Sequence, residues 1–220
     1  MATALITGAN RGIGLELCKQ LEAKGFGVIA TCRKSSPELD ALGVRVETGI
    51  DVGSDDVVKT LADRLKGVSI DWLVCNAGIL SSESLDHLDF DGIRRQFEVN
   101  SVGPLRVTKA LLPNLKKGSK IALITSRMGS IADNGSGGMY GYRMSKAALN
   151  AAGKSLAIDL KDRGVAVVIL HPGFVRTDMT GGNGMIGPDE SARGLIERIE
   201  ELKLETTGTF RHMNGDELPW

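Results

Sequence analysis

A short apolar stretch at residues 2–6 runs directly into the glycine-rich segment Thr7-Gly8-Ala9-Asn10-Arg11-Gly12-Ile13-Gly14. Apolar residues then recur at helical spacing, as Leu15, Leu17, Cys18 and Leu21. The pattern predicts a buried strand that turns into a helix through a glycine-rich corner. Glycines let the backbone approach a ligand closely, and a helix start offers unpaired N–H groups with a partial positive charge. We expect the corner to bind a nucleotide phosphate. A tight turn without a ligand is the alternative, because the glycine spacing differs from the standard dinucleotide fingerprint.

Length and charge limit the classes of function. The chain has 220 residues, with 27 basic and 27 acidic side chains and no net charge. A single α/β domain of this length is ordinary and buries a large core. Because no basic stripe is present and the apolar runs are too short to span a bilayer, we expect neither nucleic acid nor a membrane as a partner. Cys18, Cys32 and Cys75 lack metal-ligand spacing, which predicts reduced thiols in a cytoplasmic protein and no metal site.

Segments with strand and helix patterns alternate along the whole chain. We predict strands at residues 2–7, 27–31, 44–50, 70–75, 120–125, 165–171 and 208–212. Helices are expected at residues 14–24, 54–65, 90–115, 142–162 and 189–202. Several of the strands are continuous apolar runs, which is typical of strands covered on both faces. The alternation predicts a single Rossmann-type α/β domain, a doubly wound parallel sheet of about seven strands with helices on both faces.

The end of the second predicted strand, Thr31-Cys32-Arg33-Lys34, contains no acidic residue. A dinucleotide site that prefers NAD places a carboxylate here, on the adenosine ribose. Arg33 and Arg11 instead offer charge-assisted hydrogen bonds to a 2′-phosphate, which favours NADP. The alternative for Arg33 and Lys34 is a solvated loop. Asp51, after the third strand, either accepts a hydrogen bond from adenine or caps the next helix.

Tyr142 and Lys146 are four residues apart and therefore share one face of a predicted helix. A nearby ammonium favours the phenolate and lowers the pKa of a phenol from its usual value of about 10, which suits proton exchange near neutral pH. Ser126 ends the fifth predicted strand, and a loop can bring it to Tyr142. Tyr140 is not the candidate, because Met144 stands four residues after it. Each feature alone is common, and Ser126 can equally be a strand-end cap.

Taken in order, these segments resemble the short-chain dehydrogenase/reductase family over almost the whole chain. The cofactor motif of the family matches residues 7–14, its Asn-Ala-Gly motif residues 76–78, and its Pro-Gly residues 172–173, with Thr177 following. Its catalytic residues match Asn100, Ser126, Tyr142 and Lys146. The segments at residues 142–150 and 215–220 are typical of the short C-factor/sniffer-like carbonyl reductases. Two departures are a longer interval between Ser126 and Tyr142 and a short segment after Thr177, which predicts a small lid and an open pocket.

The resemblance implies NADPH-dependent reduction of a ketone, aldehyde or quinone. It assigns Tyr142 as the general acid and Ser126 as a donor to the carbonyl oxygen. Lys146 holds the nicotinamide ribose and lowers the pKa of Tyr142, and Asn100 holds a helix distortion and a water near Lys146. Residues 1–125 form a cofactor half, and residues 126–220 form a catalytic and substrate half. The implied NADP(H) contacts are Gly8, Asn10, Arg11, Gly12, Ile13, Gly14, Arg33, Asp51, Val52, Asn76, Ala77, Gly78, Tyr142, Lys146, Pro172, Gly173, Val175 and Thr177.

Two other functions stay open. One is a dinucleotide-binding regulatory or signalling protein of the C-factor type, although such a role does not need Ser126, Tyr142 and Lys146. The other is an NAD-dependent alcohol dehydrogenase, against which the basic residues and the missing acid argue. The resemblance further implies a homodimer or homotetramer formed through the helices around residues 103–115 and 142–162. The pocket for a small-molecule substrate has five candidate lining residues, Ile79, Met128, Ile131, Met179 and Met185. Methionine suits an adaptable apolar surface, but it is equally common as a core residue.

Overall fold

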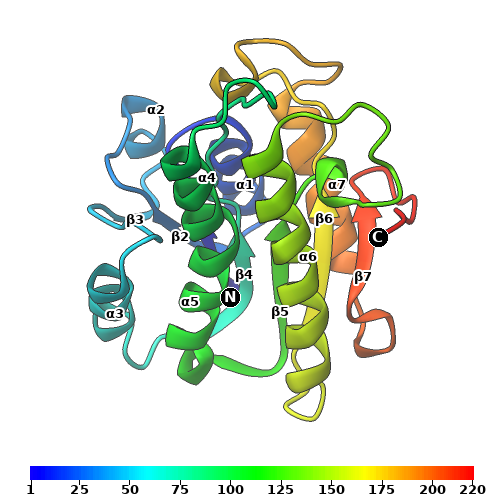
Figure 1. Cartoon of the computed structure of the whole chain (residues 1–220). Helices are drawn as coiled ribbons and strands as arrows, with labels where there is room; N and C mark the ends of the chain where they lie inside the picture. The colour runs from blue at the N-terminus through cyan, green and yellow to red at the C-terminus, as the bar shows by residue number, and fades with distance from the viewer.

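The computed structural model describes all 220 residues. Seven parallel strands form one sheet in the order β3-β2-β1-β4-β5-β6-β7 (Figure 1). Because the chain starts in the middle of the sheet and winds first to one edge and then to the other, a crevice opens between β1 and β4, where the winding reverses. The strands are β1 (Thr3–Thr7), β2 (Gly27–Thr31), β3 (Arg45–Glu47), β4 (Ile70–Cys75), β5 (Leu115–Ile124), β6 (Ala166–His171) and β7 (Thr209–His212).

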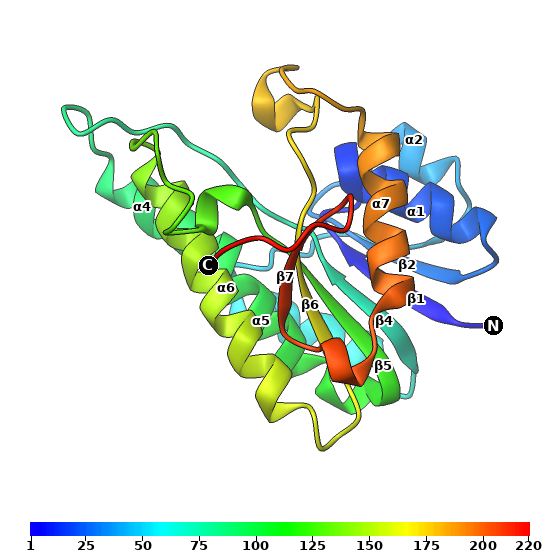
Figure 2. The same ribbon diagram turned by 90° about the vertical axis from the view of Figure 1, so that its right-hand side faces the viewer.

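Helices cover both faces of the sheet. Helices α1 (Gly12–Ala23) and α7 (Pro188–Glu201) pack on one face, whereas α3 (Asp55–Arg64), α5 (Gly103–Ala110) and α6 (Tyr140–Asp159) pack on the other. Figure 2 shows the two layers with the sheet between them. Two further helices, α2 (Pro37–Asp40) and α4 (Phe90–Phe97), lie beside the loops that follow β2 and β4. This arrangement is the predicted doubly wound α/β fold.

The strands are apolar throughout because both faces are covered. In β1, Ala4 and Ile6 point into one core cluster and Leu5 into the other, and all three are fully buried. Burying one aliphatic side chain of this kind contributes roughly 1.5–3 kcal/mol. Two predicted strand bounds were wrong, since β3 covers only residues 45–47 and β5 begins at Leu115 rather than at residue 120. The short helix α2 was not predicted.

The helix predicted over residues 90–115 is not continuous. Helix α4 passes into a π-helical segment, η1 (Glu98–Val102), before α5 begins at Gly103. Pro104 has no N–H to donate to the carbonyl of Asn100, four residues earlier, so the α-helical ladder is interrupted there. Pro113 lies in a short 3₁₀ turn, η2 (Leu112–Asn114), which leads directly into β5.

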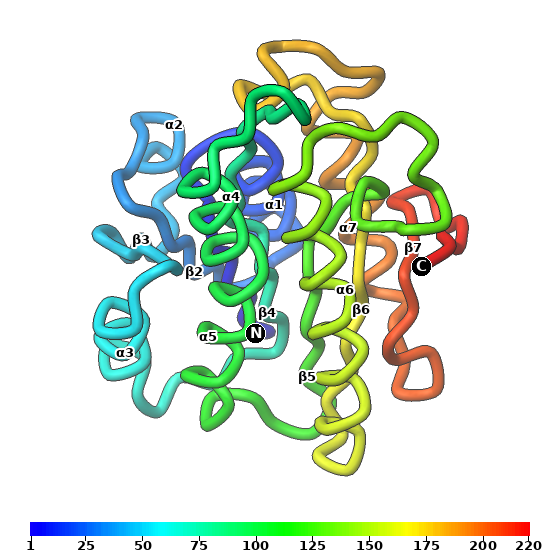
Figure 3. Tube along the Cα trace, viewed as in Figure 1, coloured from blue at the N-terminus to red at the C-terminus, as the bar shows by residue number.

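The loops that follow β4, β5 and β6 gather at the carboxyl edge of the sheet (Figure 3). The glycine-rich corner between β1 and α1 lies at the same edge, because parallel strands all end there.

The three cysteines are buried free thiols, and burial raises the pKa of Cys18 and Cys75 to about 12. None of the helices combines the length and apolarity that crossing a bilayer requires.

Candidate active site

The glycine-rich corner is built by close packing against β4 and α1. Gly8 has a φ of +67°, and an added Cβ would lie 2.8 Å from the Cα of Ala77. A Cβ on Gly14 would lie 2.3 Å from the carbonyl oxygen of Gly8. These positions therefore exclude any side chain. Helix α1 begins at Gly12 without a side-chain cap, so its first N–H groups stay available to a ligand.

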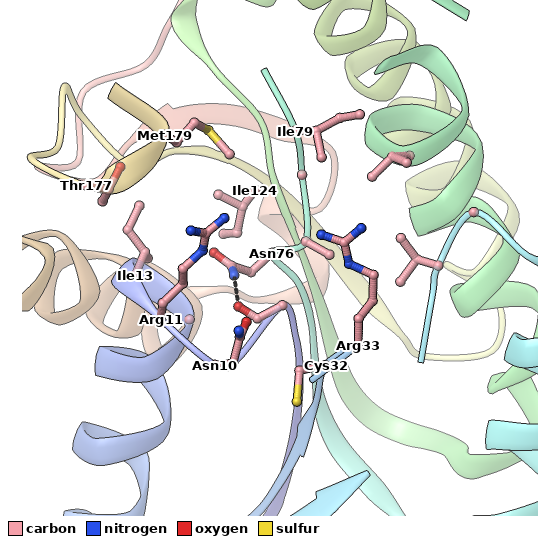
Figure 4. Close-up of a pocket in the computed structure, with 18 of the residues that line it drawn as sticks. Asn10, Arg11, Ile13, Cys32, Arg33, Asn76, Ile79, Ile124, Thr177 and Met179 are labelled. Carbon is pink, nitrogen blue, oxygen red and sulfur yellow. Dashed lines mark hydrogen bonds between the residues drawn. The ribbon is translucent and has the colours of Figure 1, made fainter. Parts of the chain in front are cut away.

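Thr7 and Asn76 fasten the ends of β1 and β4 to each other. The Thr7 hydroxyl accepts hydrogen bonds from the backbone N–H groups of Asn76 and Ala77, both at 3.0 Å. The Asn76 amide donates to the carbonyl oxygens of Thr7 and Gly8, at 3.0 and 3.1 Å (Figure 4). Asn76 thus holds the corner in shape while lying at the wall of the cavity.

A cavity of about 1310 Å³ runs from the end of β2, past the glycine-rich corner, to α6. It is larger than the roughly 300–1,000 Å³ that is usual for a drug-sized ligand. The cofactor residues predicted from the sequence line it, with two exceptions. Gly173 and Val175 are not part of the wall; both belong to residues 172–187 between β6 and α7, the lid segment, in which Val175 is buried. Those that do line it are Gly8, Asn10, Arg11, Gly12, Ile13, Gly14, Arg33, Asp51, Val52, Asn76, Ala77, Gly78, Tyr142, Lys146, Pro172 and Thr177.

Basic side chains outnumber carboxylates on the cavity wall. Arg11 and Arg33 point into the cavity from opposite sides (Figure 4). Arg11 pairs with Asp178 of the lid segment at 2.8 Å, but both side chains are largely exposed. Such a pair contributes at most about 1 kcal/mol, so Arg11 is free to exchange Asp178 for a ligand. The basic residues of the wall are Arg11, Arg33, Lys34, Arg94, Arg95, Lys146 and Arg176, and the carboxylates are Asp51, Glu98 and Asp178.

Tyr142 and Lys146 lie at the other end of the cavity, on one face of α6. The Lys146 ammonium nitrogen is 5.8 Å from the centre of the Tyr142 ring and donates to the carbonyl oxygen of Ile124 at 2.9 Å. The Ser126 hydroxyl lies beside the phenol. The helical turn after Ser126 reaches α6 because Gly129 has no side chain: a Cβ there would lie 2.7 Å from the carbonyl carbon of Lys146.

Burial controls the ionisation of this pair. It raises the pKa of Tyr142 to about 12, and the hydrogen bond with Ser126 opposes the rise. Burial also lowers the pKa of Lys146 to about 8. The sequence predicted a phenol pKa lowered by Lys146, and the structure without a ligand shows the opposite direction. The reason is that the loss of hydration outweighs an ammonium that lies beside the ring and bonds to Ile124.

Asn100 joins the loop after β4 to α6. Its amide oxygen accepts from the N–H of Ile79 and its amide nitrogen donates to the carbonyl of Ile79, both at 2.8 Å. The same nitrogen donates to the Ser145 hydroxyl at 3.0 Å. Asn100 lies in the π-helical segment η1, so the helix distortion implied by the resemblance is present. Asn100 is fully buried and, like Ser126, is not part of the cavity wall.

Asp51 does not cap the following helix. Its carboxylate accepts from the N–H of Gly53 at 2.9 Å, and Ser54 caps α3 by accepting from Val57.

Among the predicted substrate residues, Ile79 and Met179 line the cavity, whereas Met128, Ile131 and Met185 do not. Residues of the wall that the sequence did not predict lie mostly at or near the ends of strands and helices, and they include Cys32, Ile50, Gly53, Ser54, Val99, Ile124, Thr125 and Pro188.

Comparison with known proteins settles the family. The family model of the short chain dehydrogenases matches residues 2–184. This chain belongs to the short-chain dehydrogenase family. The 1-hydroxy-2-glutathionyl-2-methyl-3-butene dehydrogenase of Rhodococcus sp. (strain AD45) is 45% identical to this short-chain dehydrogenase over 226 residues, which cover 100% of both chains.

Two solved structures resemble this short-chain dehydrogenase over its whole length. The carbonyl reductase Sniffer of D. melanogaster has a TM-score of 0.93 and 31% identity, and all of both chains is covered. The NADPH-bound carbonyl reductase from chicken fatty liver has a TM-score of 0.91 and 29% identity, covering 100% of this chain and 99% of that one. The short-chain dehydrogenase is therefore an oxidoreductase that binds a nicotinamide dinucleotide. The bare glycine corner, the uncapped start of α1 and the size of the cavity fit such a cofactor.

Proposed function

We propose that this short-chain dehydrogenase reduces a carbonyl compound to an alcohol with NADPH. The observation that carries the proposal is the Tyr142 phenol, which lies at the cavity wall beside Ser126 and which, with a pKa raised by burial to about 12, stays protonated at neutral pH. A reductase needs a proton donor next to the substrate oxygen, and a protonated phenol is one.

Each side chain of the site has a distinct role in the proposal. The bound dinucleotide supplies the hydride that goes to the carbonyl carbon. Tyr142 donates its hydroxyl proton to the oxygen, and Ser126 donates a hydrogen bond that stabilises the negative charge developing there. Lys146, with a pKa of about 8, carries its charge at neutral pH and reaches the ribose hydroxyls of the cofactor. Asn100 positions the loop that carries Ile79 beside the substrate.

The choice of NADPH over NADH rests on the end of β2. Arg33 and Lys34 line the cavity there and no carboxylate follows the strand, so a 2′-phosphate meets positive charge rather than repulsion. The carbonyl reductase from chicken fatty liver, which shares this fold, is an NADPH-bound protein.

A panel of α-diketones, quinones, aldehydes and ketones, scored by NADPH oxidation, tests the proposal. We expect turnover with activated carbonyls, and Tyr142→Phe to lower it by about 10²- to 10⁴-fold while NADPH still binds, since the ring is kept and only the proton donor is lost. Tyr140→Phe is the matched control and keeps the wild-type rate. A chain that binds NADPH tightly but reduces nothing in the panel contradicts the proposal, and so does a Tyr142→Phe variant with full activity.

A second candidate is oxidation of an alcohol, which the name of the Rhodococcus relative favours. That relative acts on a hydroxylated glutathione conjugate by its name, so the same panel includes alcohols that carry a glutathionyl thioether. Faster turnover of such an alcohol with NAD⁺ or NADP⁺ than of any carbonyl with NADPH would favour this candidate.

A further inference from the structure

Glu83, in the loop between β4 and α4, has a buried carboxylate that the proposed chemistry does not use. The residue is only 4% exposed. All three side-chain hydrogen bonds to its carboxylate come from neutral donors. A buried carboxylate without a cationic partner is costly unless its hydrogen bonds serve a purpose.

The three donors come from three different segments. The Ser81 hydroxyl donates to one carboxylate oxygen at 2.8 Å from the same loop, and the Gln96 amide donates to that oxygen at 2.6 Å from α4. The N–H of Gly141, in the first turn of α6, donates to the other oxygen at 3.1 Å. Glu83 therefore joins the loop, α4 and the start of the catalytic helix, which lie side by side in Figure 2.

The start of α6 depends on this carboxylate because the helix has no cap of its own. Its N-cap residue, Met139, makes no side-chain cap and is the one residue other than glycine with a positive φ, 54°. The Met139 N–H donates to the backbone carbonyl of Glu83 at 2.9 Å. Glu83 thus holds a strained turn with its backbone and accepts a first-turn N–H with its side chain. Its negative charge is also favourable at a helix N-terminus.

Tyr142 directly follows the residue that Glu83 binds. Gly141 sits so close to α4 that an added Cβ would lie 2.4 Å from the Gln96 amide nitrogen and 3.1 Å from a Glu83 carboxylate oxygen. A shift of this contact moves the first turn of α6 and the phenol with it. We propose that Glu83 is a positioning residue that holds Tyr142 opposite Ser126, an inference that rests on the proposed role of Tyr142 as proton donor.

A carboxylate is needed at this position because every neighbour donates. Glutamine at residue 83 keeps only one acceptor oxygen, so its NH2 group faces a donor in either orientation, the Gln96 amide nitrogen in one and the N–H of Gly141 in the other. Gln96 cannot turn over freely, because its oxygen already accepts from the N–H of Ser81 at 3.0 Å. Exchanging the two side chains, Glu83→Gln together with Gln96→Glu, restores a donor facing an acceptor and leaves an oxygen for Gly141.

Turnover of NADPH with a small α-diketone tests the inference in four proteins: wild type, Glu83→Gln, the exchanged pair, and Asp86→Asn as a control that removes an exposed carboxylate from the same loop. We expect Glu83→Gln to lower kcat by about 10- to 100-fold with the NADPH Kd changed less than about twofold, since misplacing the phenol by a fraction of an ångström affects the chemical step. The exchanged pair regains most of the lost kcat, and Asp86→Asn matches wild type. An unchanged kcat in Glu83→Gln, or a loss that the exchange does not reverse, overturns the inference.

Amide exchange of Gly141, followed by NMR on the NADPH-bound protein, gives a readout that does not depend on turnover. We expect faster exchange in Glu83→Gln and the wild-type rate in the exchanged pair, because the N–H loses and regains its acceptor. A wild-type protein that reduces no carbonyl overturns the proposed function, whereas unchanged Gly141 exchange in Glu83→Gln overturns the role of Glu83. If Glu83→Gln does not fold, Gln96→Met, which removes one donor to the carboxylate, takes its place with the same expected loss of kcat, and an unchanged kcat in that variant overturns the inference.

Discussion

The pKa of the Tyr142 hydroxyl bears on whether the enzyme works better as a reductase or as an alcohol dehydrogenase. This pKa is raised to about 12 because the phenolate loses hydration, and Ser126 offsets only part of the rise. At neutral pH the group is therefore a proton donor, which suits reduction. Alcohol oxidation needs the phenolate. As long as the pH is below the pKa, the phenolate fraction rises about tenfold for each unit by which the pH increases.

We accordingly expect the initial rate of alcohol oxidation to rise with pH between 6 and 10, while carbonyl reduction does not gain from higher pH. Initial rates in both directions with saturating cofactor measure this. Tyr142→Phe should lose the rise along with the activity. Oxidation that is fastest at or below neutral pH would contradict the role of Tyr142.

Lys146 shows the cost of keeping a charge in the site. Burial lowers its pKa from 10.5 to about 8, and its one protein hydrogen bond goes to Ile124. The folded-state pKa lies below the unfolded value, so below pH 8 the buried ammonium destabilises the fold, by about 3 kcal/mol for a difference of this size. As pH rises from about 8 toward 10.5 the folded protein is already neutral while the unfolded chain still binds the proton, and the cost disappears.

Lys146→Met should therefore make the cofactor-free protein more stable at pH 7. We expect a net gain of about 2 kcal/mol, after subtracting about 1 kcal/mol for the lost hydrogen bond. Urea denaturation at pH 7 and at pH 10 measures the free energy of unfolding, and the advantage of the variant should shrink at the higher pH. Turnover is lost in the same variant. A variant less stable than wild type at pH 7 would show that the ammonium is stabilised by contacts other than the bond to Ile124.

At the scale of elements, the sequence predicted what depends on local pattern. The strand at residues 27–31 and the strand at residues 70–75 have the predicted bounds, because continuous apolar runs between polar turns mark buried strands. The Tyr142 and Lys146 pair lies on one helix face because four-residue spacing requires it. Both predictions needed only the local pattern of apolar residues and the four-residue spacing along a helix.

Features that depend on distant segments did not follow from the local pattern. The π-helical segment around Asn100 was implied by the family resemblance alone, because the two helical patterns around it look continuous and only Pro104 in the sequence marks a break. The role of Glu83 could not be predicted from the sequence, because its partners Gln96 and Gly141 are 13 and 58 residues away along the chain. The raised pKa of Tyr142 likewise depends on burial by the folded chain, and the contact with Ser126 that opposes the rise joins residues 16 positions apart.

At the scale of the whole molecule, the cavity brings together elements from distant parts of the chain, all of which a bound cofactor would contact. The wall includes residues from the ends of β1, β2 and β4, the start of α1, α6 and the lid segment after β6. A ligand that binds only the folded state stabilises it by mass action, by about 2.7 kcal/mol at a concentration 100 times its Kd. For a chain of this length each kcal/mol raises Tm by roughly 2–4 °C.

NADPH should therefore raise Tm by about 5–10 °C when it is present at 100 times its Kd, and NADH at the same concentration by less. The difference comes from the 2′-phosphate, which faces Arg33 and Lys34 at the end of β2. Arg33→Asp replaces an attraction with a repulsion, so the advantage of NADPH should vanish or reverse while the NADH shift is kept. Arg163→Asp makes the same charge change at an exposed site before β6, away from the cavity, and should leave the preference intact. Thermal scans of the three proteins with each cofactor decide the matter. Equal shifts with NADPH and NADH in the wild type, or an Arg33→Asp variant that still prefers NADPH, would place the basis of cofactor choice elsewhere than at the end of β2.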